Sequence, residues 1–109
     1  MTQAVAALAA LAQETRLAIH RLLVEAGPEG LPAGRIGEKL DLPPATLSFH
    51  LAQLARTGLV RGRQDGRFVI YSADFESMNA LVGYLTENCC GGRACAPSGK
   101  PARKERKAA

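Results

Sequence analysis

Features that commonly identify an enzyme or a membrane protein are missing from this chain of 109 residues. With two histidines and three cysteines, it shows no grouping of nucleophile, base and acid, so we expect that it is not an enzyme. The apolar run at residues 4–12 has no basic leader and is far shorter than the roughly 20 residues that span a membrane. We therefore expect a cytoplasmic protein with no membrane partner.

An excess of positive charge is also missing from most of the chain. The first 92 residues contain eight basic and nine acidic side chains, whereas residues 93–109 contain six basic side chains and one acidic. The pI of about 9.3 therefore comes from the C-terminal end and cannot by itself indicate binding to nucleic acid. For residues 96–109 we expect a basic disordered tail, with weak contact to phosphates as the alternative.

Apolar periodicity and turn signals predict a mainly helical chain with one β-hairpin. We expect helices at residues 4–12, 14–26, 34–40, 44–57 and 73–88. Asp65-Gly66, between the short runs 59–64 and 67–72, is a strong hairpin signal. The third and fourth helices have the spacing of a helix-turn-helix. A basic hairpin directly after them predicts a winged helix. We expect this domain to cover residues 1–95.

The fourth expected helix has an apolar face and a polar face. Leu47, Leu51 and Leu54 recur at helical spacing and should pack in the core. The other face carries side chains able to read base edges in a major groove, namely Thr46, Ser48, Phe49, His50 and Gln53. Three wing arginines, which should cluster at the hairpin tip, suit phosphate or minor-groove contact: Arg61, Arg63 and Arg67. A generic polar helix surface and a solvated hairpin are the alternatives.

All three cysteines fall within seven residues, at Cys89, Cys90 and Cys95. Thiolates suit soft, thiophilic ions, and the two glycines between them tolerate the positive φ angles of a tight loop. The last helix should bring Cys89 and Cys90 to its C-terminal end, and the loop 91–94 is long enough to bring Cys95 back over them. We favour a site within each subunit, although the two subunits of a dimer could also share one. A disulfide-forming redox switch, a zinc or cadmium site and inert surface thiols are the alternatives.

Four segments of the chain resemble the ArsR/SmtB family: residues 13–17, residues 42–54, Gly58-Leu59-Val60 and the Asp-Gly hairpin. The resemblance covers about residues 3–95. It implies a dimeric winged-helix repressor that releases its operator DNA when a metal or metalloid binds. The first and last helices have broad apolar faces, and we expect them to form the homodimer interface.

Members of this family place their sensing sites on different elements. Here residues 35–40 contain no cysteine and residues 73–88 contain no histidine, so the family's sites on those helices are absent. Arsenic-responsive members have a vicinal cysteine pair after the last helix and a third cysteine a few residues on, which Cys89, Cys90 and Cys95 match. The resemblance therefore implies As(III) as the inducer, with Sb(III) as a further candidate. As(III) favours three thiolates, whereas structural zinc prefers four ligands, and both histidines lie in the helix-turn-helix half of the chain.

Overall fold

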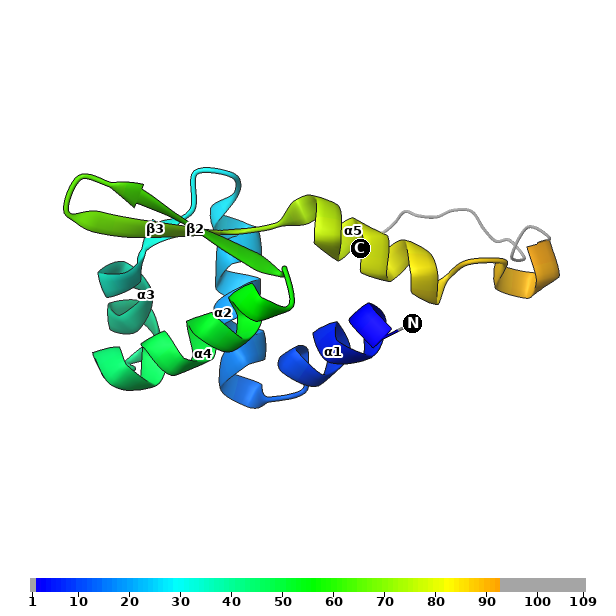
Figure 1. The fold of residues 1–109 in the computed structure, drawn as a ribbon, viewed down its shortest axis with the longest axis horizontal. Helices are drawn as coiled ribbons and strands as arrows, with labels where there is room; N and C mark the ends of the chain where they lie inside the picture. Colours follow the sequence, from blue (N-terminus) through cyan, green and yellow to red (C-terminus); the bar gives the residue numbers. More distant parts are fainter. Residues whose placement is uncertain (1, 93–109) are drawn as a thin grey trace.

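In the computed structural model, residues 2–92 are described, and they form five α-helices and three strands. The bounds are α1 Thr2–Leu11, α2 Glu14–Ala26, β1 Leu31–Pro32, α3 Ala33–Leu40, α4 Pro44–Arg56, β2 Val60–Asp65, β3 Phe68–Ala73 and α5 Phe75–Leu85, followed by a 3-10 turn at Cys89–Gly92. Figure 1 shows α2, α3, α4 and the hairpin packed as one body, with α5 extending away from it on the side of α1. Cys95 and the predicted tail at 96–109 lie outside the described residues.

The core confirms the apolar face predicted for the fourth helix. Leu47, Leu51 and Leu54 are all buried, beside apolar side chains from the other elements: Ile19 and Leu23 of α2, Ile36 of α3, and Leu59 and Val60 at the start of the wing. Each such side chain contributes about 1.5–3 kcal/mol relative to an exposed position. The leucine spacing therefore fixes which face of α4 points inward and leaves the other face open.

The wing is the predicted hairpin, with one strand that the sequence analysis missed. Strands β2 and β3 pair in antiparallel register from Val60↔Ala73 to Asp65↔Phe68. The missed strand, β1, is only two residues long and pairs antiparallel with β3. It is preceded by Gly30, whose φ of 72° and close approach to the backbone of Tyr71 leave no room for a side chain. So short a strand with a proline in it carries almost no sequence signal.

Helix α5 is shorter than predicted. It begins after Asp74, whose carboxylate accepts a hydrogen bond from the backbone N–H of Ser77 at 3.0 Å, and it ends at Leu85 rather than Asn88. The apolar stripe stops at Leu85, and Asn88 adopts a left-handed φ of 57°, so nothing holds another helical turn in place. Cys89 and Cys90 therefore follow a short connecting segment instead of the helix end itself.

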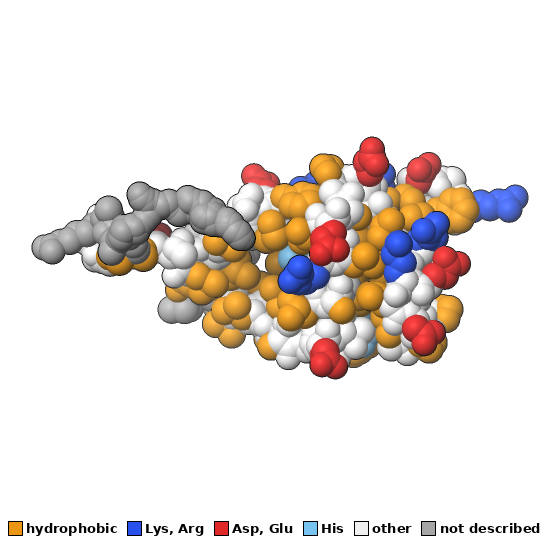
Figure 2. Space-filling view, turned by 180° about the vertical axis from the view of Figure 1, so that it is seen from behind, with side chains coloured by type: hydrophobic (Ala, Val, Ile, Leu, Met, Phe, Trp, Pro, Cys, Tyr) orange, Lys and Arg blue, Asp and Glu red, His pale blue; other side chains and the backbone are white. Residues whose placement is uncertain are grey.

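No residue of α5 is buried, although Phe75 and Leu81 pack partly against the core. Val82 and Leu85 are each more than half exposed. Figure 2 shows hydrophobic side chains open to solvent on the extended part of the molecule, while charged side chains lie mainly on the body. Within residues 2–92, no helix is long and apolar enough to cross a membrane. The exposed apolar side chains of α5 form a patch of the kind that another protein surface covers.

Candidate DNA interface and cysteine segment

The candidate recognition helix, α4, has well-defined ends. Pro44 occupies its first turn, where a missing N–H does no harm. At the other end Thr57 Oγ1 donates to the carbonyl of Leu54 at 2.9 Å, and Gly58 follows with a positive φ of 80°, which suits a glycine after a helix. The outward face of α4 therefore extends from Pro44 to Arg56.

The structure divides the residues proposed for base contact into two groups. Thr46, Ser48 and Phe49 are fully on the exposed face, and Phe49 is 58% exposed. Gln53 and His50 are half-buried. The imidazole of His50 lies edge-on to the ring of Phe49, with 5.4 Å between ring centroids. The three exposed side chains therefore form the open part of this face.

His50 makes a contact inside the protein that sequence reasoning missed. Its Nδ1 lies 3.3 Å from the guanidinium NH1 of Arg16, on α2. Since arginine has no acceptor atom, a hydrogen bond in this contact is donated by Arg16 and accepted by Nδ1 of His50. Arg16 Nε also donates to the carbonyl of Ala10, at the end of α1, at 2.7 Å. Arg16 thus joins α1 to the recognition helix, and its only sequence signal was its place in the segment 13–17.

The expectation that three arginines cluster at the wing tip is wrong. Arg61 lies opposite Ser72 at the base of the hairpin, and its Nε donates to Asp74 Oδ2 at 2.9 Å. Arg63 donates to the carbonyl of Glu29 at 3.2 Å. Only Arg67 lies at the tip, beside Phe68, which is 61% exposed and was not among the predicted contact residues. Strand β2 spreads Arg61 and Arg63 over its length, whereas Arg67 lies in the turn between β2 and β3.

The ion pair at the base of the wing shifts the ionisation of both partners. The pKa of Asp74 is lowered, chiefly by the hydrogen bond from the backbone N–H of Ser77 and then by the hydrogen bond from Arg61. The pKa of Arg61 is raised, chiefly by its hydrogen bond to Asp74. Both groups therefore stay charged over the physiological range.

Cys89 and Cys90 are exposed, and their Sγ atoms lie 3.7 Å apart. The backbone places Cys90 at a φ of 58°, followed by Gly91 and Gly92 at positive φ. The third proposed ligand, Cys95, lies outside the described residues, and residues 2–92 alone hold no group of three metal-ligating side chains. His20 is buried within α2, and burial lowers its pKa. The structure therefore brings two of the three proposed thiols together.

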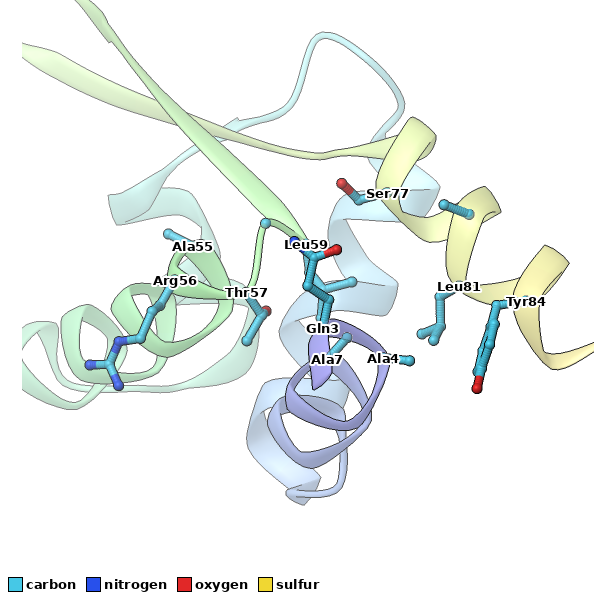
Figure 3. A pocket seen from close by; sticks show the side chains of 12 residues that line it. Gln3, Ala4, Ala7, Ala55, Arg56, Thr57, Leu59, Ser77, Leu81 and Tyr84 are labelled. Carbon is cyan, nitrogen blue, oxygen red and sulfur yellow. The ribbon is translucent and has the colours of Figure 1, made fainter. Parts of the chain in front are cut away.

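A shallow pocket of about 490 Å³ lies between α1, the end of α4 and α5 (Figure 3). Ala4 and Ala7 line it from α1, and Leu81 and Tyr84 line it from α5. The small side chains of Ala4 and Ala7 leave space between α1 and α5 that no other lining side chain fills. The pocket and the exposed apolar side chains of α5 together leave a surface suited to a second chain.

Comparison with known sequences identifies relatives along most of the chain. A family model described as a helix-turn-helix domain matches residues 11–63. The transcriptional activator HlyU of Vibrio cholerae is 34% identical, over 81% of this chain and 79% of that protein. The regulator YgaV of Escherichia coli is 32% identical, over 81% of this chain and 87% of its own. A Halobacterium salinarum protein named for repression of an arsenical resistance operon is 38% identical, over 72% of this chain and 60% of that protein.

Comparison with solved structures gives the same answer for the fold. Reduced HlyU from Vibrio cholerae has a TM-score of 0.63 and 33% identity, covering 82% of this chain and 90% of that one. An ArsR-like regulator from Rhodococcus has a TM-score of 0.68 and 26% identity, covering 84% and 82%. A homodimeric winged helix-turn-helix domain from Mycobacterium bovis has a TM-score of 0.63 and 25% identity, covering 84% and 85%.

These relatives are transcriptional regulators, which confirms the expectation that the chain is not an enzyme. The winged helix-turn-helix fold is likewise confirmed. The resemblance inferred from the motifs is borne out at the level of the family: the chain belongs to the ArsR/SmtB family of winged helix-turn-helix transcriptional regulators.

Proposed function

We propose that the protein is a homodimeric repressor that releases its operator when As(III) binds Cys89, Cys90 and Cys95. Family membership supports DNA binding, and the name of the Halobacterium salinarum relative supports an arsenic response. The homodimer is supported by the exposed apolar side chains of α1 and α5 and by the homodimeric Mycobacterium bovis domain.

The observation that carries the proposal is the 3.7 Å separation of the two vicinal sulfur atoms. For comparison, metal–sulfur bonds of about 2.3 Å at a tetrahedral angle place two thiolates about 3.8 Å apart. The pair can therefore bind one soft ion with little movement. As(III) needs one more thiolate, which Cys95 supplies in this proposal, whereas zinc needs two more ligands.

Binding should depend on pH because thiolates, not thiols, are the ligands. An ordinary cysteine has a pKa of about 8.5, so each ligand releases a proton on binding near neutral pH. Affinity for As(III) should therefore fall as the pH is lowered.

The DNA response follows from the position of the thiols relative to the dimer surface. Closing residues 89–95 around an ion changes the chain just beyond α5, the helix proposed to pair with its copy. If the closed form favours another arrangement of the two subunits, both recognition helices lose their spacing on the operator. Couplings of this kind are typically about 1–3 kcal/mol, or roughly 5- to 150-fold in affinity, and DNA must weaken As(III) binding by the same factor.

The test is a titration of the reduced protein with As(III), Sb(III), Zn(II) and Cd(II). Release of a labelled promoter fragment from the cell's arsenic-resistance region is followed by fluorescence anisotropy. We expect release by As(III), and its loss in Cys89→Ser, Cys90→Ser and Cys95→Ser. Thr86→Ser is a matched control, since it keeps a hydroxyl beside the site and changes no thiol. If all three serine variants release DNA as the wild type does, the site assignment fails.

A second candidate is a thiol-based redox regulator, favoured by the exposure of both cysteines and by the existence of a reduced form of HlyU. Adjacent Cα atoms are about 3.8 Å apart, below the usual disulfide range of about 4.4–6.8 Å. A switch of this kind would therefore join Cys95 to one of the pair. Peroxide-driven release that dithiothreitol reverses, with no effect of As(III), would establish this function in place of the first.

A further inference from the structure

Helix α5 is attached to the winged-helix body mainly at its N-terminal end. Near that end Phe75 packs partly against the core and Gly58 approaches Ser77, and midway along the helix Leu81 also packs partly against the core. Toward the other end, Val82 and Leu85 are each more than half exposed. Because no residue of α5 is fully buried, a change in its direction disturbs little of the core, and the contacts at its N-terminal end help to set where the rest of the helix points.

Asp74 stands at this junction and is bonded in three directions. Its backbone N–H donates to the carbonyl of Leu59, just before β2, at 2.9 Å. Its Oδ1 accepts from the N–H of Ser77 in the first turn of α5, at 3.0 Å, and its Oδ2 accepts from Nε of Arg61 on β2, at 2.9 Å. One carboxylate therefore ties the first turn of α5 to the base of the wing.

We propose that Arg61 and Asp74 form a latch that sets the direction of α5 relative to the wing, so that Arg61 acts as a positioning residue and not as a phosphate ligand. In the proposed dimer the wing faces DNA and α5 faces the partner subunit. The latch therefore sets the orientation of the DNA-binding surface relative to the dimer interface. This step rests on the proposed dimer through α5 and is independent of the inducer.

The latch and a phosphate-binding role for Arg61 predict opposite effects for one substitution. Asp74→Asn removes a negative charge near the wing, so charge alone would strengthen DNA binding. Asparagine is as good an N-cap as aspartate, so the start of α5 is preserved. If the latch positions the dimer, Asp74→Asn instead weakens DNA binding, and Arg61→Gln weakens it to a similar degree.

Arg63 provides a matched control on the same strand. Its side chain donates to the carbonyl of Glu29 and makes no bond to α5 within the described residues. Arg63→Gln and Arg61→Gln remove the same charge from the same face of the hairpin, two residues apart. Of these two substitutions, only Arg61→Gln removes the contact with Asp74.

The experiment compares the wild type with Arg61→Gln, Asp74→Asn, the double variant and Arg63→Gln, all as full-length reduced protein without metalloid. Residual dipolar couplings of the backbone amides report the direction of α5 relative to α4 and the wing. Affinity and its salt dependence are measured on a labelled duplex that the wild type selects from a random-sequence library. Sedimentation equilibrium of each variant reports the dimer separately.

We expect the residual dipolar couplings of α5 to change in Arg61→Gln, Asp74→Asn and the double variant alike, because the helix reorients or becomes more mobile. In Arg63→Gln the couplings of α5 should stay as in the wild type. DNA affinity should fall several-fold in those three variants by similar amounts, with no loss of salt dependence. Unchanged α5 couplings would overturn the latch, as would tighter DNA binding by Asp74→Asn. A wild type that is monomeric by sedimentation would overturn the proposed dimer and, with it, the latch.

Discussion

Arg16 offers a direct test of how the N-terminal helix is connected to the recognition helix. Arg16→Met keeps the apolar stem of the side chain and removes both guanidinium contacts, to the carbonyl of Ala10 and to Nδ1 of His50. The first is a charge-assisted bond of 2.7 Å at a half-buried site, and the second is longer. Together they should stabilise the fold by about 1–3 kcal/mol, which corresponds to a fall of several degrees in Tm for a domain of this size.

The assay is urea unfolding followed by circular dichroism, with Arg21→Met as the control. Arg21 lies on the same helix and, among residues 2–92, makes only an exposed ion pair with Glu25, at 3.4 Å, which is expected to contribute about 0–0.5 kcal/mol. Combining Arg16→Met with His50→Leu isolates the contact between the two side chains, for which we expect a coupling of about 0.5–1 kcal/mol. If Arg16→Met is as stable as Arg21→Met, the connection described here does not hold the helices together.

Three further predictions follow from other parts of the structure. Val82→Glu should raise the dimer dissociation constant at least about tenfold in sedimentation experiments, because an unpaired carboxylate would enter the interface, while Gln64→Glu on the wing adds the same charge without effect. Leu54→Ala should lower the free energy of unfolding by about 2–5 kcal/mol, since its side chain is fully buried; a loss below about 1 kcal/mol would contradict that packing. The pKa of Asp74 is lowered in the folded state, so its stabilisation is present above about pH 4 and is lost as the pH falls through that lower value. Urea unfolding should therefore depend less on pH, between about pH 6 and pH 3, in Asp74→Asn than in the wild type.

The sequence was most informative where a pattern is local. The leucine spacing of the fourth helix and the Asp-Gly turn each depend on neighbouring residues only, and the structure confirms both. The end of α5 was misjudged because the apolar stripe and the helix stop at Leu85, while no glycine or proline marks that position. The helix ends at its cap residue Thr86, whose hydroxyl donates to the carbonyl of Val82 at 2.9 Å.

Roles that depend on distant partners could not be predicted from the sequence. Arg16 meets His50 across 34 positions of the chain, and Arg61 meets Asp74 across 13. Sequence alone shows a basic side chain near DNA-binding elements and cannot show that another element already holds it. The cysteine segment combines a local and a distant feature. The pair Cys89 and Cys90 is visible in the sequence as neighbouring residues, whereas the proposed closure by Cys95 lies outside the described residues.

The light packing of α5 also bears on how such a regulator can change over time. Because no residue of this helix is buried in its own subunit, substitutions near its end leave the DNA-reading body and its core intact. New ligand side chains can therefore be tried at residues beyond Leu85 with little risk to folding. A chain built in this way can exchange the signal it detects while it keeps the operator it reads.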